Sequence, residues 1–310
     1  MDSAESSPAA VPPPGNPKAL KIAVTGGSGR VGSPLVRYLV ERGHSVINID
    51  KKQAREPFAK FVYADLRDRF QVQHALEGMD AVCHLGEIPH QPSHMSSEEM
   101  YSHNTRVGSV VMQAAADAGV SRIIYTSSCQ VYGFWGHPIT APVTLPMDET
   151  HPLQPQNVYA LAKAANEGFA RLLAEERKLS IAIFRFPAVR NRVLEEMREP
   201  DWDWLKRGGG FGDGCYTYVH TSDVARAFDL ALQNPRTGCE AYHFSAKEVF
   251  CTANIRQKLI EAFPHFPALP EHWAAHDSPV LCSKAREHFD WKPAWNMLDF
   301  FREKFGSAAG

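Results

Sequence analysis

The chain has 310 residues, of which 44% are hydrophobic and 22% are charged. That is enough apolar material to bury one large core, or one core with a smaller lobe attached. Because 33 Lys and Arg face 35 Asp and Glu, the net charge of -2 gives no general attraction to nucleic acid or to an anionic membrane. No apolar run approaches the roughly 18 residues of a membrane-spanning helix, so we expect no membrane contact.

The first nineteen residues differ from the rest of the chain. They contain five prolines and almost no large apolar side chain. We expect a disordered tail over residues 1–19, with a partner-binding polyproline II segment as the alternative. Asp2 and Glu5 stand where a signal peptide is basic, and no apolar signal core follows. Six scattered cysteines form no Cys-x-x-Cys pair, which favours reduced thiols in a cytoplasmic protein.

From residue 20, short apolar runs rich in Val and Ile alternate with amphipathic stretches of helical length. We expect strands at 20–25, 44–49, 60–64, 80–85, 121–128, 181–186 and 241–246, and helices at 30–43, 104–119, 157–176, 221–232 and 252–263. Runs that are apolar on both faces are typical of parallel strands covered by helices on both sides. The sequence therefore predicts an α/β fold with a doubly wound parallel sheet.

A glycine-rich segment, TGGSGRVG at residues 25–32, follows the first expected strand and opens the first expected helix. This context is typical of a dinucleotide-binding turn. Gly26 permits the tight turn, Gly29 lets the backbone approach a pyrophosphate, and Gly32 allows close packing of helix and strand. The helix start then offers free N–H groups to the phosphates. A glycine-rich turn without a ligand is the alternative.

An acidic residue, Asp50, follows the second expected strand. It can accept hydrogen bonds from the adenosine ribose hydroxyls and repels a 2′-phosphate, which favours NAD over NADP. Arg30 and the lysines at 51–52 lie close enough in sequence to offset that preference, unless they are solvated surface charges. The Asp-Leu pair at 65–66 follows the third strand, where it either lies beside the adenine or caps a helix.

A second motif is the Tyr-Ala-Leu-Ala-Lys run from Tyr159 to Lys163. Residues four apart share a helix face, so the Lys163 ammonium lies near the Tyr159 phenol and lowers its pKa toward a range useful to a general base. Such a run is common by chance. Its value here comes from the preceding glycine-rich turn and from TSSCQVYG at 126–133, a serine-rich strand end.

In combination, several motifs resemble the extended short-chain dehydrogenase/reductase family, which includes the NAD-dependent epimerases and dehydratases. They are TGGSGRVG, the terminal Asp50, HLG at 84–86, NTRVG at 104–108, SSCQVYG at 127–133, YALAK and HTSDVARA at 220–227. The resemblance covers residues 20 to 294. It implies a Rossmann fold, a bound nicotinamide cofactor and a Ser–Tyr–Lys catalytic set. We expect an NAD-binding domain at 20–186 and a small C-terminal substrate-binding lobe at 187–310, interleaved with the last strands of the sheet.

The resemblance also places individual residues. Within SSCQVYG the matching catalytic serine is Ser128, with Ser127 and the Cys129 thiol beside it and Ser127 as its rival. Asn104 matches a helix asparagine that arranges the active site. The expected cofactor contacts are Gly26, Ser28, Gly29, Arg30, Val31, Gly32, Asp50, Asp65, Leu66, Leu85, Gly86, Asn104, Tyr159, Lys163 and Pro187. The expected substrate contacts are Ser127, Ser128, Cys129, Tyr159 and Ala188.

The implied reaction is removal of a hydride from a secondary alcohol. Tyr159, as phenolate, accepts the hydroxyl proton while the hydride leaves for the nicotinamide. Ser128 hydrogen-bonds the same oxygen. Lys163 holds the tyrosine pKa down and binds the nicotinamide ribose.

The sequence departs from the nucleotide-sugar enzymes of this family at two places. Ala188 stands where those enzymes carry an Asn that holds the sugar diphosphate, and the segment that follows it is short. The HLGEI loop is similar to the HLGGI loop of uronate dehydrogenase, whereas FGDG…YVHTSDVARA resembles the epimerase version. We therefore expect an NAD-dependent sugar or sugar-acid oxidoreductase. A UDP-sugar 4-epimerase and a catalytically silent NAD-binding regulator are the alternatives.

Three further expectations concern histidines, tryptophans and assembly. The loop histidines, among them His90 and His94, have no third ligand at a useful spacing, so we expect substrate contacts there and no metal. Trp202 and Trp204 either stack on a sugar ring or close the lobe. The helices at 104–119 and 157–176 are candidates for pairing in a homodimer through small residues, unless these face the sheet of their own subunit. The small residues include Ala114, Ala115, Ala164 and Ala165.

Overall fold

The computed structural model describes residues 18–135, 140–190, 217–250, 254–264, 270–271, 273–296 and 299. Several expectations lie outside these residues: most of the N-terminal tail, the glycine-rich segment at 195–214, Trp202 and Trp204, and the cysteines at 215 and 251. The four described cysteines are free thiols. Within the described part of the chain, no helix combines the length and the hydropathy that a bilayer crossing requires.

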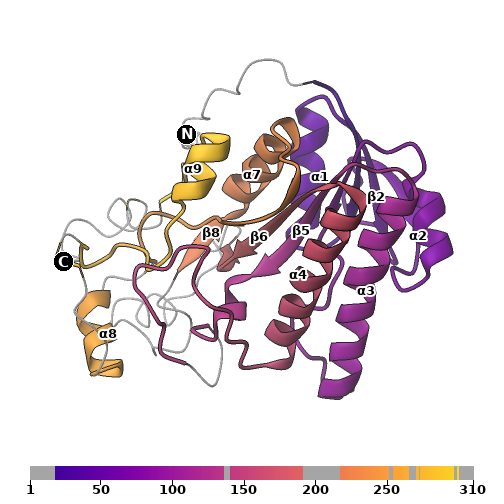
Figure 1. Ribbon diagram of the computed structural model, residues 1–310. Coiled ribbons are helices and arrows are strands. Elements are labelled where there is room, and N and C mark those ends of the chain that lie inside the picture. Colours follow the sequence, from indigo (N-terminus) through magenta and orange to yellow (C-terminus); the bar gives the residue numbers. More distant parts are fainter. Residues whose placement is uncertain are drawn as a thin grey trace, which may run out of the picture.

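Seven parallel strands form the main sheet (Figure 1). They are β1 (Lys21–Thr25), β2 (Ser45–Asp50), β3 (Lys60–Tyr63), β4 (Ala81–His84), β5 (Arg122–Ser128), β6 (Ser180–Phe186) and β9 (Gly238–His243). Their spatial order is β3-β2-β1-β4-β5-β6-β9. The order runs outward from β1 in one direction and from β4 in the other, which is typical of a doubly wound Rossmann sheet. The predicted fold class is confirmed.

Helices cover both faces of this sheet (Figure 1). On one face lie α2 (Arg69–Leu76), α3 (Ser97–Asp117) and α4 (Val158–Arg177), whose apolar residues share a core with the strands. On the other face lie α1 (Gly32–Glu41) and α7 (Thr221–Gln233), with α9 (Ser283–Phe289) beyond them. The double covering explains why the strands read as continuous apolar runs.

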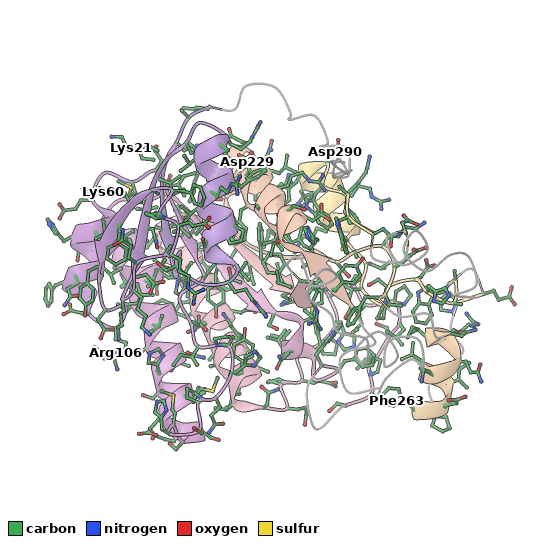
Figure 2. The ribbon with its side chains drawn as sticks, turned by 180° about the vertical axis from the view of Figure 1, so that it is seen from behind. Lys21, Lys60, Arg106, Asp229, Phe263 and Asp290 are labelled. Carbon is green, nitrogen blue, oxygen red and sulfur yellow. The ribbon has the colours of Figure 1, made fainter. Side chains whose placement is uncertain are left out.

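The chain returns to the main sheet after residue 217. The strand β9 pairs with β6, and α7 packs beside α1. Asp229 of α7, labelled in Figure 2, is buried against the end of α1. It accepts a hydrogen bond from Arg42 Nε at 2.9 Å and lies 3.0 Å from His44 Nε2. Part of the segment after residue 187 thus completes the nucleotide-binding layer.

A smaller unit stands at the end of β5 and β6. The strands β7 (Ala188–Arg190) and β8 (Tyr218–His220) form a parallel pair, and α8 (Ile255–Ala262) lies at the far side, ending before Phe263 (Figure 2). A separate apolar cluster fills this unit, built on large aromatic side chains that include Trp135, Tyr218, Phe250 and Trp273. It lies next to the 3-10 turn η1 (Cys129–Tyr132), which carries the end of β5 away from the sheet.

The expected elements differ from the observed ones mainly at their ends. The helix expected at 104–119 begins seven residues earlier, because the Ser96 side chain and Glu99 form a reciprocal capping box. The last expected strand, 241–246, is shifted toward the N-terminus as β9. Helix α2 was expected only through the alternative in which the pair at 65–66 caps a helix: Val72 and Leu76 are its buried residues, and its start is set by the Asp68 cap.

Candidate active site

The glycine-rich loop after β1 meets the loop after β4 at the point where the strand order reverses. Gly26 has φ +71°, and a Cβ on it would lie 2.7 Å from Gly86 Cα. A Cβ on Gly32 would lie 2.2 Å from the Gly26 carbonyl oxygen, so the first turn of α1 packs directly on the loop. Crevices at such switch points are where doubly wound sheets bind their ligands.

The start of α1 suits a pyrophosphate. Val31 precedes the helix and makes no side-chain cap, and the first turn carries no acidic residue. The N–H groups and the positive end of the helix dipole are therefore free of a side-chain anion. Gly29 is exposed at this position, and Arg30 next to it lines a cavity described below. These residues fit a dinucleotide.

Asp50 ends β2 beside the same loop. Its Oδ2 accepts a hydrogen bond from Ser28 N at 3.2 Å and its Oδ1 one from Lys51 N at 2.7 Å. The Lys51 ammonium itself pairs with Asp65 at 3.0 Å, and Arg67 pairs with the same carboxylate at 2.6 Å. These two cations hold the pKa of Asp65 well below its usual range.

The suggested helix-capping role of Asp65 is wrong, because Asp68 caps α2. Leu66 packs over the loop after β4: its Cδ1 would lie 2.1 Å from a Cβ on Gly86. Leu85 N donates to the Thr25 carbonyl at 3.0 Å, which fixes that loop against β1.

The three candidate catalytic side chains come from β5 and α4. Ser128 ends β5, and its Oγ accepts a hydrogen bond from Gln130 N at 3.2 Å. Tyr159 and Lys163 follow the Asn157 cap of α4 and occupy successive turns on one face. Lys163 Nζ lies 5.6 Å from the centroid of the Tyr159 ring and donates to the Thr126 carbonyl.

The electrostatic balance at Tyr159 differs from the sequence prediction. Burial raises the pKa of Tyr159 above its usual value, while Lys163 and the Ser128 hydroxyl lower it and Glu87 raises it again. The expected lowering by Lys163 is present, but burial outweighs it, so the net direction of the Tyr159 pKa is upward. The Lys163 ammonium lies 3.1 Å from the Glu87 carboxylate.

Glu87 is a residue of the site that the sequence analysis missed. It directly follows Gly86, and its side chain is almost completely buried. The only sequence signal was the glutamate in HLGEI where the similar loop of uronate dehydrogenase has glycine. Its partner Lys163 lies 76 positions further along the chain, so the pairing needed the fold.

Two predicted contacts have other partners in the structure. The side-chain amide of Asn104 makes two hydrogen bonds with Ile88: Ile88 N donates to Oδ1 at 3.0 Å, and Nδ2 donates to the Ile88 carbonyl at 2.9 Å. Its Oδ1 also lies 3.2 Å from His103 Nδ1. Asn104 therefore holds the loop after β4, and its expected cofactor contact stays a prediction. The Ser127 hydroxyl donates to the buried Glu167 at 2.7 Å, which occupies it away from a substrate. Ser128, which lines the cavity described next, stays the candidate catalytic serine.

A cavity of about 320 Å³ opens beside Ser128. Pro187 and Ala188 form another part of its wall, where β6 passes into β7. Cys129 also lines it, although its buried thiol donates to the Arg185 carbonyl. The described lining includes three basic side chains, those of Arg30, His90 and Arg190. In the described residues, no group of His, Cys, Asp and Glu has the arrangement of a metal site.

Comparison with known proteins identifies the relatives of this chain. The model of the "NAD dependent epimerase/dehydratase family" matches residues 22–245. UDP-glucose 4-epimerase from Lactobacillus helveticus is 34% identical over 319 residues, covering 90% of this chain and 94% of that protein. The uncharacterized protein y4nG from Sinorhizobium fredii is 29% identical over 246 residues, covering 77% of this chain and 59% of that protein.

A solved structure shares the fold of this chain. A solved short-chain dehydrogenase/reductase superfamily protein from Agrobacterium tumefaciens, with bound NAD, gives a TM-score of 0.70 at 22% identity. The match covers 93% of this chain and 96% of that structure.

Proposed function

Because the chain belongs to the NAD-dependent epimerase/dehydratase family, and is thus an NAD-dependent enzyme, we propose that it oxidises a secondary alcohol of a sugar or sugar acid. The observation that carries this proposal is the grouping of Ser128, Tyr159 and Lys163 at the ends of β5 and α4. Ser128 opens into a cavity large enough for a single sugar ring.

NAD would be held by the loop after β1 and by Asp50. The N-terminus of α1, which has no side-chain cap, would face the pyrophosphate, and the Asp50 carboxylate would accept hydrogen bonds from the ribose. A bound NAD would supply the acceptor for the hydride of the carbinol carbon. Tyr159 removes the hydroxyl proton, and Ser128 donates a hydrogen bond to the same oxygen as its charge changes.

The charge of the cavity favours an acidic substrate. Arg30, His90 and Arg190 line it, and its lining includes no acidic side chain among the described residues. A sugar carboxylate would gain a charge-assisted hydrogen bond from the Arg30 guanidinium. Ala188 offers no polar side-chain atom on this wall, which removes one holder of a diphosphate.

A nucleotide-sugar 4-epimerase is the second candidate. The relative from Lactobacillus helveticus is a UDP-glucose 4-epimerase and aligns with almost the whole chain. The same tyrosine, serine and lysine would serve, since an epimerase returns the hydride to the opposite face of the ketone. The two candidates differ in net reaction and in the need for a nucleotide.

A substrate panel separates them. The purified protein is mixed with NAD and with free sugars, uronates or UDP-sugars, and absorbance at the NADH band is followed. We expect NADH to accumulate with a uronate or free sugar. Tyr159→Phe should lower the rate of NADH formation by several orders of magnitude while the variant still binds NAD. Interconversion of two UDP-sugars without net NADH formation would show that the protein is an epimerase and would refute the proposed dehydrogenase activity. Unchanged turnover in Tyr159→Phe would exclude the assigned base.

We also propose that the protein forms a homodimer through α4. Four exposed residues, Leu161, Ala165, Gly168 and Leu172, recur along one side of this helix. A Cβ on Gly168 would meet nothing within 4 Å, so the middle of the stripe is open to a close neighbour. On α3, Ala114 and Ala115 are fully buried against their own sheet, so the alternative stated for these two alanines is the correct one.

A further inference from the structure

The Glu87 carboxylate lies against Lys163 but has no part in the proton transfer proposed above. Its Oε2 lies 3.1 Å from Lys163 Nζ, and both side chains are nearly inaccessible to solvent. Its Oε1 accepts a hydrogen bond from Asn166 Nδ2 at 3.1 Å and lies 3.6 Å from His84 Nε2. The carboxylate is therefore held by two residues of α4, Lys163 and Asn166, and His84 at the end of β4 lies beside it.

The structure around Glu87 fixes its position. The Asn166 amide also donates to the Asn104 carbonyl at 3.0 Å, which ties α4 to α3. Gly108 on α3 makes room for this amide, because a Cβ there would lie 2.1 Å from Asn166 Nδ2. The Asn104 side chain holds Ile88, the residue after Glu87, by two hydrogen bonds. The Glu87 carboxylate is thus fixed by Asn166 at its side chain and by the Asn104–Ile88 hydrogen bonds at the neighbouring backbone.

Among the described neighbours of Lys163, Glu87 is the carboxylate that no arginine neutralises, so it is the one that pairs with the lysine. Glu167, also on α4, is bound by Arg185 at 2.6 Å, so its charge is already offset. His84 on β4 is fully buried, and burial lowers its pKa, which keeps the ring neutral. From β5, Tyr125 presents an uncharged ring 4.9 Å from the Lys163 ammonium.

Among the residues that the structure describes, the charges that face Tyr159 are consequently those of one ion pair. Lys163 on α4 and Glu87 in the loop after β4 act on the phenol with opposite signs, and the Ser128 hydroxyl at the end of β5 is uncharged. A lysine lowers a tyrosine pKa by favouring the phenolate, and a carboxylate beside the lysine cancels that effect.

The geometry points to Glu87 as a positioning residue of the Tyr–Lys pair: it holds the Lys163 ammonium, neutralises it toward Tyr159, and so confines proton removal to alkaline solution. This inference rests on the proposed function for its catalytic consequence. The charge balance itself is a property of the folded chain and can be measured without a substrate.

The test titrates Tyr159 directly. The full-length protein is labelled with ¹³C at the tyrosine ζ carbons, and Tyr159→Phe identifies the resonance of interest. We expect the wild-type pKa of Tyr159 to lie above the usual 10.0. Glu87→Gln should lower it by about one pH unit, and Glu87→Asp, which keeps the charge, should leave it close to wild type. A wild-type pKa below 10, or equal values in wild type and Glu87→Gln, would overturn the inference.

The kinetic arm of the test follows the rate of NADH formation against pH. Its acid limb should move to lower pH in Glu87→Gln by the same amount as the tyrosine resonance, and stay in place in the control Glu41→Gln, an exposed acid on α1. If Glu87→Gln does not fold, the wild-type titration and Glu87→Asp still decide. If the resonance shifts as expected while no sugar is oxidised, the proposed function fails and the role of Glu87 stands.

Discussion

His243 makes the stability of the protein depend on pH in a predictable direction. The ring lies at the end of β9 and is fully buried. Its Nδ1 faces the Leu281 carbonyl at 3.1 Å and its Nε2 faces the Tyr132 hydroxyl, which itself accepts a hydrogen bond from Arg185. A neutral ring satisfies both contacts, donating through Nδ1 and accepting at Nε2. Burial and the nearby guanidinium lower the pKa of His243 to about 3.

The sign follows from proton binding. Between about pH 6.5 and pH 3 the unfolded chain protonates this histidine and the folded chain does not, so stability falls as the pH falls. Integration from about pH 7.5 to pH 5 gives a loss of about 2 kcal/mol from His243 alone.

Urea denaturation at the two pH values measures this loss. Wild type and His243→Gln are compared, with His74→Gln, an exposed histidine of α2, as the matched control. We expect His243→Gln to be less stable at neutral pH, because it disturbs the Tyr132 contact, but to lose about 2 kcal/mol less than wild type on acidification. The control should follow wild type. An equal acid loss in His243→Gln and wild type would refute the assignment of a neutral buried ring.

Three further outcomes can be measured. Asp50→Ala should weaken NAD binding by about ten- to a hundredfold in a fluorescence titration, because a charged acceptor of the ribose hydroxyls is lost. The difference between the NAD and NADP affinities should become smaller, and an unchanged ratio of the two affinities would contradict the role of Asp50. Arg185→Met should lower the free energy of unfolding, measured by urea denaturation, by about 3–5 kcal/mol, because it leaves Glu167 buried and charged. The double variant Arg185→Met/Glu167→Leu should recover most of this stability, and additive losses would argue against the ion pair. Leu172→Glu should convert a dimer to a monomer in sedimentation velocity, whereas a monomeric wild type at micromolar concentration would remove the α4 interface.

The strands could be located from the sequence because their apolar residues occupy both faces. The bounds of helix α2 could not be predicted for the opposite reason: Phe70 is 82% exposed, and the buried face of the helix is narrow. The choice between Ser127 and Ser128 needed the structure, because neighbours on a strand point to opposite sides and only the fold says which side holds Glu167. The pairing of Glu87 with Lys163 joins distant parts of the chain, so no local spacing could indicate it.

The position of β9 at the edge of the sheet has a consequence for how the protein is made. A nascent chain that has reached residue 186 has built β6, but the outer N–H and C=O groups of that strand have no partner until Gly238–His243 emerges. Until then β6 is an open, apolar strand edge of the kind that recruits other chains. The acid on α7 that holds Arg42 and His44 is also still missing. We therefore expect a fragment that ends at residue 186 to be prone to aggregation. During synthesis, about fifty further residues must be added before β9 can pair with β6 and complete the sheet.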